Sequence, residues 1–204
     1  MKNISKNFEA LYLSANASQL EQGMSWYFTA HAIAKRLYEA YSAQGVTLRQ
    51  VCGVISALSP NNAWTRNIID AEILLNAFTS GLTMNDVKVC TFNTNKAKAW
   101  SILEGQDAET VITANKTLNF FLNIFVPSER YVCVDGHMLN AGVYGFTRKP
   151  LSAVKSTPNT KLTDKTYYGW ADVIATLAHK YDILPQQMQA VIWTVYRDLV
   201  VQPK

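Results

Sequence analysis

The stretch that decides the fold reads KTLNFFLN at residues 116–123 and YVCVDGH at residues 131–137. Apolar residues recur at helical spacing in the first run, so we expect a helix over 115–125 that ends before Pro127. The second run starts as a short extended apolar segment and reaches Asp135, which stands where the N-cap of a helix should be. From that cap we expect a helix to about residue 144, with Gly145 behind it.

Helical periodicity continues through most of the chain on both sides of this stretch. Thr47 and Gln50 have the spacing of a capping box, which predicts the start of a helix over 48–58. That segment is apolar on most sides and is therefore expected to be buried. The residues SPNN at 59–62 are expected to end it and to cap the next helix. The other expected helices span residues 24–43, 64–78, 96–103, 166–181 and 186–200, and together they predict an all-α fold.

Composition limits the classes of protein to consider. Of 204 residues, 49% are hydrophobic and 17% are charged, which supports a sizeable core and argues against disorder. The net charge of +4 permits a polyanionic partner without requiring one. The N-terminus lacks the apolar region of a signal peptide, and no apolar run is long enough to cross a bilayer. We therefore expect a cytoplasmic protein with no membrane partner.

The chain has three widely spaced cysteines, Cys52, Cys90 and Cys133, which argue against a disulfide framework and include no CxxC pair. This usage fits a reducing compartment. It also predicts no structural zinc and no iron–sulfur cluster, so we expect no metal-binding residues.

Residues 116–137 resemble the catalytic segment of the endonuclease III type of DNA glycosylase, a member of the helix-hairpin-helix superfamily. In that family a Lys-Thr-Ala-Asn helix leads to an apolar run and Val-Asp-Thr-His. Upstream, NKAK at 95–98 resembles the family's Lys-Ala helix start, and VISALS at 54–59 resembles its Leu-Leu-Ser-Ala-Gln helix end, in the same order. The likeness spans residues 51–144.

The whole chain is also similar to a group of uncharacterised phage and bacterial proteins. The segments that carry this second likeness are ISALSP at 55–60, VDGH at 134–137 and QAVIW at 189–193. If the chain has a phage origin, the expected compartment is the host cytoplasm. This likeness supports the fold but implies no activity.

The resemblance implies an all-α, two-lobed glycosylase (HhH-GPD) fold for the single domain 1–204. Its lobes are expected at about 48–125 and at 1–47 plus 126–204. Asp135 would stabilise the positive charge that develops at C1′ when an N-glycosidic bond breaks. Lys116 matches the family's lysine nucleophile, which forms a Schiff base at C1′. The family's Gly-x-Gly phosphate-binding hairpin is replaced by ITAN at 112–115, so we expect a degenerate hairpin.

Other polar and aromatic side chains are candidates for recognising a base. Gln189, Trp193 and Arg197 follow the i, i+4, i+8 spacing of one helix face. An amide, an indole and a guanidinium on one face can read and stack on a base. A second cluster lies at the junction before the helix over 64–78. The residues expected to bind the substrate are Gln189, Trp193, Arg197, Asn61, Asn62, Trp64 and His137.

Each of these candidates also has a structural interpretation. Asp135 can act only as a helix N-cap, and Lys116 only as a solvated helix lysine. His137 can be a satisfied structural histidine, and Trp193 can belong to the core. Arg197 can pair with a carboxylate such as Asp198 or Asp182. The residues 147–165 form a basic segment that can be an ordinary surface loop.

Three functions fit this sequence. The first is a glycosylase-like enzyme that cleaves the N-glycosidic bond of a modified base or nucleoside, with DNA or a nucleotide as partner and no cofactor. The second keeps the fold but modifies a base substituent, as phage base-hypermodification enzymes do, with Lys116, Arg197 or the basic segment binding a pyrophosphate leaving group. The third is a non-catalytic protein that binds DNA or a host partner. The target base and the oligomeric state stay open at this point.

Overall fold

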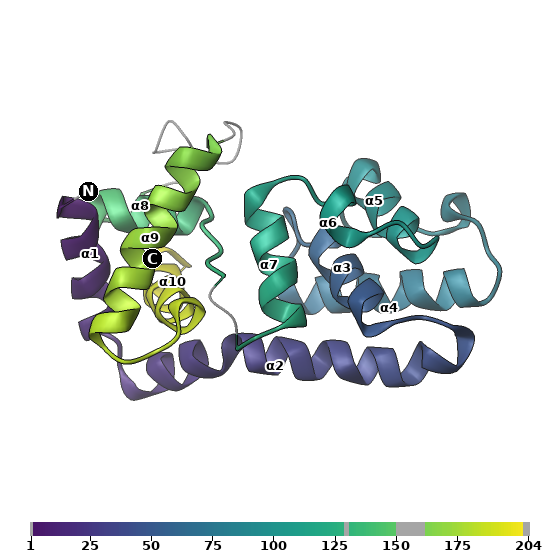
Figure 1. The fold of residues 1–204 in the computed structure, drawn as a ribbon, viewed down its shortest axis with the longest axis horizontal. Coiled ribbons are helices and arrows are strands. Elements are labelled where there is room, and N and C mark those ends of the chain that lie inside the picture. Colours follow the sequence, from purple (N-terminus) through teal and green to yellow (C-terminus); the bar gives the residue numbers. More distant parts are fainter. Residues whose placement is uncertain (1, 129–130, 150–161, 202–204) are drawn as a thin grey trace. The chain divides into compact units, whose positions relative to one another are not determined.

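The computed structural model describes residues 2–128, 131–149 and 162–201, and these residues form helices and no strand. This confirms the all-α prediction for the described part of the chain. The chain divides into two compact units (Figure 1). Unit 1 comprises Met1–Phe28 and Pro127–Lys204, and unit 2 comprises Thr29–Val126. The first boundary falls inside the long helix α2 (Ala17–Tyr41), which begins in unit 1 and ends in unit 2.

Unit 2 is built around α3, every residue of which from Val51 to Leu58 is buried. Helices α4, α5 and α7 pack against α3. The predicted bounds of α3 and α7 agree with the structure, and so does the burial of α3. After α2 the elements of this unit are η1 (Ser42–Gln44), α3 (Leu48–Leu58), α4 (Trp64–Thr79), η2 (Met84–Asp86), α5 (Asn93–Leu103), α6 (Ala108–Val111) and α7 (Asn115–Phe125).

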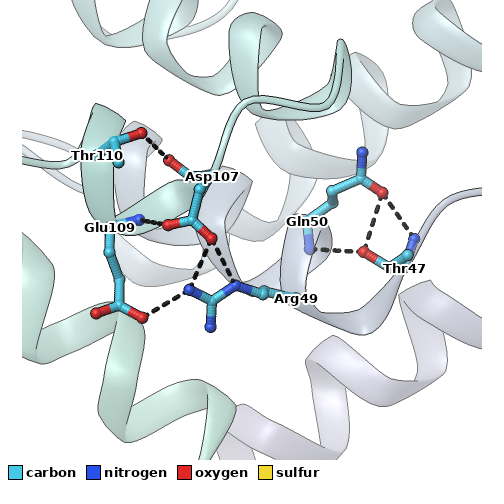
Figure 2. Close-up of polar contacts among 6 residues, drawn as sticks. All are labelled: Thr47, Arg49, Gln50, Asp107, Glu109 and Thr110. Atoms are coloured by element: carbon cyan, nitrogen blue, oxygen red, sulfur yellow. Dashed lines mark hydrogen bonds and ion pairs between the residues drawn. The ribbon is translucent and has the colours of Figure 1, made fainter.

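Polar contacts hold the start of α3 in place (Figure 2). The predicted capping box is present: the Thr47 hydroxyl accepts from the backbone N–H of Gln50, and the Gln50 side-chain oxygen accepts from the Thr47 N–H at 2.9 Å. In the first turn of the helix, Arg49 pairs with Glu109 at 2.6 Å and with Asp107 at 3.0 Å, joining α3 to α6. The hydrogen bond to Glu109, followed by the contacts with Asp107, raises the pKa of Arg49.

Unit 1 is formed by segments from both ends of the chain. It contains α1 (Lys2–Leu13), the first part of α2, α8 (Gly136–Tyr144), α9 (Asp164–Lys180) and α10 (Pro185–Val201). Helix α1 packs on α8, α9 and α10, and it inserts Phe8 and Leu11 into the core. Two glycines allow close approach: a Cβ at Gly142 would lie 2.3 Å from Trp170 Cζ3, and one at Gly23 would lie 2.5 Å from Val191 Cα.

A surface cluster fastens α1 to the end of α9. The Glu9 carboxylate accepts from Lys180 Nζ at 2.5 Å and from Tyr181 Oη at 2.6 Å. The hydrogen bond from Lys180, and then that from Tyr181, lowers the pKa of Glu9.

Several expected helix starts are wrong, and the reasons are local. Helix α2 begins at Ala17 and not at 24, because Asn16 and Gln19 exchange capping hydrogen bonds there. Helix α5 likewise begins at Asn93 and not at 96. The segment at 59–62 does not cap α4, whose N-cap is Ala63, since the Asn62 amide donates to Asp70 instead.

Two helices were not predicted from the sequence, and part of the predicted basic segment belongs to a helix. Helices α1 and α6 have no counterpart among the expected elements. Of the basic segment 147–165, residues 150–161 lie outside the described part of the chain, and α9 already begins at Asp164. Among the helices that the structure describes, none combines the length and the apolar character needed to cross a membrane.

Candidate functional site

Asp135 is held at the start of α8 by both of its carboxylate oxygens. Its backbone is extended, and Oδ1 accepts from the Met138 N–H at 2.9 Å, which confirms the predicted N-cap. Its Oδ2 accepts from the indole Nε1 of Trp193 on α10, also at 2.9 Å. The carboxylate is half-buried. Each oxygen has two lone pairs, so each keeps one for a further donor.

The segment that leads to Asp135 is buried without forming regular secondary structure. Val132, Cys133 and Val134 are all buried, and their backbone groups need partners. Tyr167 on α9 supplies them: its hydroxyl donates to the Val132 carbonyl at 2.8 Å and accepts from the Val134 N–H at 3.0 Å. Burial raises the pKa of Tyr167, so the phenol keeps the proton that it donates.

Trp193 is the centre of an aromatic cluster beside this carboxylate. The ring of His137 meets the Trp193 ring edge-on, with centroids 5.9 Å apart and planes at 89°. The ring of Trp26 lies 5.9 Å away at 37°, and the guanidinium carbon of Arg197 lies 4.9 Å from the Trp193 ring centroid. Helices α2, α8 and α10 therefore all contribute to the surroundings of Asp135.

The side chains of His137 and Gln189 differ in their hydrogen bonding. The Nδ1 atom of His137 is buried and has no hydrogen-bond partner among the described residues, while its ring also packs on Tyr196. Gln189 is buried, and its side-chain oxygen accepts from the Tyr27 hydroxyl at 2.7 Å. The Gln189 side chain thus ties α10 to α2.

Arg197 is anchored on one nitrogen. Its Nη2 donates to Gln22 Oε1 at 3.2 Å and lies 3.4 Å from Asp198 Oδ1, which is the pairing that the structural interpretation of the sequence named. The other oxygen of Asp198 accepts from Gln19 at 2.9 Å.

The remaining candidates lie in unit 2. Asn61 has a φ of +57°, and Asn62 donates to Asp70 Oδ2 at 2.9 Å. The ring of Trp64 meets that of Phe120 edge-on. Lys116 lies in the first turn of α7. The structure thus brings Asp135, His137, Gln189, Trp193 and Arg197 into one unit and places Lys116, Asn61, Asn62 and Trp64 in the other.

Sequence reasoning missed the fully buried carboxylate of Asp70. It accepts hydrogen bonds from Asn62, from Arg66 at 2.8 Å and from the Cys90 N–H at 2.9 Å. These bonds fasten residues near 90 to the junction between α3 and α4. The available signal was the i, i+4 spacing of Arg66 and Asp70, which predicts an ion pair but not its burial.

A hollow of about 610 Å³ in unit 1 lies apart from Asp135. Asp135, His137, Trp193 and Arg197 are not among the residues that line it. Its lining residues are Ser14, Gln19, Phe146, Arg148, Val195, Asp198 and Leu199. We place the candidate site at Asp135, where a carboxylate is oriented, and not at this hollow.

Potential metal ligands do not gather anywhere in the described part of the chain: no group of three His, Cys, Asp or Glu residues has suitable geometry there. Cys52 and Cys133 are buried and Cys90 is exposed, all three as thiols. Burial raises the pKa of Cys52 to about 12, so this thiol stays protonated at neutral pH.

The described residues define a class of protein: it is all-helical, it has two compact units, and in unit 1 a tryptophan orients an N-cap aspartate. Residues 1–199 match the model of a family of unknown function, DUF7178, and the chain belongs to that family. No curated protein matches the chain. No solved structure matches it either.

Proposed function

We propose that this protein is a DNA glycosylase-like enzyme with a helix-hairpin-helix glycosylase fold, a degenerate hairpin and Asp135 as its catalytic carboxylate. It acts on a modified base or nucleoside in the cytoplasm, where free thiols persist. The observation that carries the proposal is the orientation of Asp135 by two donors, the Met138 N–H and the Trp193 indole.

The chemistry asks for a fixed, accessible carboxylate. When an N-glycosidic bond breaks, its electron pair leaves with the base nitrogen and positive charge develops at C1′ and the ring oxygen. A carboxylate that cannot reorient stabilises that charge without reorganisation during the reaction. Water then adds to C1′, its proton passes to Asp135, and the departing base takes up a proton in turn. The remaining lone pairs of Asp135 are available for this step.

Lys116 defines the lyase version of the reaction. Its amine would attack C1′ in place of water and form a Schiff base with the opened sugar. Borohydride reduction tests this directly, because it traps a covalent protein–DNA adduct. We expect the adduct with the wild-type protein and not with Lys116→Ala. Product without any trapped adduct would assign the reaction to water and remove Lys116 from the mechanism.

Mass spectrometry of the products tests the proposed function. The wild-type protein and Asp135→Asn are incubated with phage and host DNA that carry natural modifications, and with nucleoside pools. Asparagine keeps the N-cap of α8 but removes the charge, so the variant should fold and lose activity. Asp172→Asn, an exposed change on α9, is the matched control and should stay active. Loss of one base, dependent on Asp135, supports glycosidic cleavage.

The same screen identifies the base-modification alternative, since a base of changed mass that remains on its sugar would replace base loss. A non-catalytic binding function is the second candidate, because both oxygens of Asp135 already serve structural hydrogen bonds. It predicts no change in any pool and equal DNA retention by the wild-type protein and Asp135→Asn. That result would overturn the enzymatic proposal.

A further inference from the structure

In the described part of the chain, the edge of Arg197 formed by Nε and Nη1 makes no hydrogen bond, and the guanidinium lies over the Trp193 ring, whose indole N–H donates to Asp135. We propose that this edge binds a phosphate of the substrate, so that the molecule processed at Asp135 is a nucleotide or a nucleic-acid strand and not a free nucleoside. This inference rests on the proposed function and names the substrate class of the same site.

The guanidinium of Arg197 is held by its neighbours, but only some of its N–H groups make hydrogen bonds. Its carbon lies 4.9 Å from the centroid of the Trp193 ring, and Nη2 is tethered to Gln22 at 3.2 Å. Among the described residues, Nε and Nη1 of Arg197 make no hydrogen bond. The side chain is 30% exposed, so that edge can meet a ligand. The contact with the indole ring and the tether to Gln22 restrict the guanidinium, which reduces the entropy lost on binding.

The neighbouring carboxylate of Asp198 makes no hydrogen bond to this edge. Its Oδ1 accepts one long hydrogen bond, from Nη2 at 3.4 Å. Its other oxygen is occupied by Gln19 at 2.9 Å. A bidentate pair would have used two guanidinium nitrogens and two carboxylate oxygens, and this geometry is absent here. Phosphate oxygens match the unused pair of donors.

Trp193 connects the phosphate site with the reacting position. Its indole N–H donates to Asp135 Oδ2, and its ring face lies against Arg197. Both groups therefore contact one indole. In a nucleotide the phosphate is only a few bonds from C1′, so one nucleotide can reach Arg197 with its phosphate while its sugar faces Asp135.

Fluorescence anisotropy with a labelled single-stranded oligonucleotide tests this assignment in the wild-type protein, Arg197→Gln, Arg197→Lys and Arg36→Gln. Arg36 is an exposed arginine of α2 in unit 2, so its variant controls for the loss of one charge. We expect Arg197→Gln to weaken binding about tenfold and to reduce the salt slope by about one. Arg197→Lys should fall in between, because lysine keeps the charge but not the fork.

Competition experiments identify the phosphate as the recognised group. Deoxynucleoside monophosphates should displace the oligonucleotide, whereas deoxynucleosides should not, and inorganic phosphate should displace it weakly. Unchanged binding by Arg197→Gln, an equal loss in Arg36→Gln, equal competition by nucleosides, or no binding of any of these ligands would each overturn the assignment.

The two proposals fail in different ways. If Arg197→Gln loses affinity but the product screen finds no chemistry, the phosphate site stands and the enzymatic function does not. If free nucleosides are cleaved as fast as nucleotides, the function stands and the phosphate site does not. Thermal unfolding of each variant separates lost binding from lost folding.

Discussion

At the scale of single residues, Asp135 combines a structural role with a proposed chemical one. One oxygen caps α8 and the other holds the Trp193 indole, so the side chain has little freedom to turn. The position of the cap followed from the sequence, because the apolar run before it and the helical pattern behind it are both local. The indole donor did not, since Trp193 is 58 residues away along the chain.

Trp193→Phe tests whether the indole orients the catalytic carboxylate. Phenylalanine keeps an aromatic ring in the cluster but removes the N–H that donates a hydrogen bond to Asp135 Oδ2. We expect kcat to fall at least about tenfold with a smaller change in KM, because a mobile carboxylate stabilises the transition state less well. The measurement is a kinetic comparison of product formation once a substrate is found.

Trp26→Phe is the matched control for this change, because Trp26 belongs to the same aromatic cluster and its ring packs against that of Trp193. Its kcat should remain close to that of the wild-type protein. Equal kinetics for Trp193→Phe and the wild-type protein would restrict Trp193 to packing.

At the scale of elements, the segment 131–135 has no regular secondary structure and depends on a neighbour for its backbone hydrogen bonds. No strand pairs with it in the described part of the chain, and Tyr167 of α9 satisfies both the Val132 carbonyl and the Val134 N–H. Periodicity predicted α9 and placed Tyr167 on it, but the use of its hydroxyl depends on how α9 packs. The sequence alone could not supply that contact.

Tyr167→Phe should destabilise this segment and displace Asp135. The change leaves a buried N–H and a buried carbonyl without their partner, and we expect a loss of about 1–3 kcal/mol in the free energy of unfolding. Chemical denaturation measures it. Tyr168→Phe serves as the control, because Tyr168 is 45% exposed and should lose little. A similar loss in both variants would contradict the role of the Tyr167 hydroxyl.

The contact between α1 and α9 should depend on pH. Hydrogen bonds from Lys180 and Tyr181 lower the pKa of Glu9 below its ordinary value of 4.5. The ionised carboxylate therefore stabilises the fold above about that pH, and this contribution is lost as the pH falls through the lowered folded-state pKa.

The measurement compares unfolding free energies of the wild-type protein and Glu9→Gln across acidic pH. The difference between them should be largest near neutral pH and should close at low pH. Glu21→Gln, an exposed change on α2, should show no such trend. A difference that does not vary with pH would refute the titration of Glu9 as its source.

At the scale of the whole molecule, each unit has its own buried residues, and unit 1 is closed by contacts between the two ends of the chain. Phe8 of α1 is fully buried and lies 6.0 Å, ring to ring, from Trp170 of α9. Both rings fit at this position because Gly142 has no side chain. The core of unit 1 therefore requires α1, which sequence periodicity did not predict.

Phe8→Ala should weaken unit 1 in particular. Removing a fully buried ring costs about 3–5 kcal/mol. Hydrogen exchange followed by mass spectrometry should show faster exchange chiefly in α1, α8, α9 and α10. Leu74→Ala, at an equally buried position in unit 2, should instead affect α3, α4 and α5. Identical exchange patterns for the two variants would contradict separate cores.

The sequence by itself determined the helical class, the bounds of α3 and α7 and the cap at Asp135. These features depend on side-chain period and on capping groups within a few residues, so local physics decides them. Only the tertiary structure decided that Trp193 and Tyr167 position the aspartate, that Arg197 lies over the Trp193 ring, and that Asp70 is buried. Those outcomes depend on which helix faces meet, and packing between residues far apart in the chain sets them.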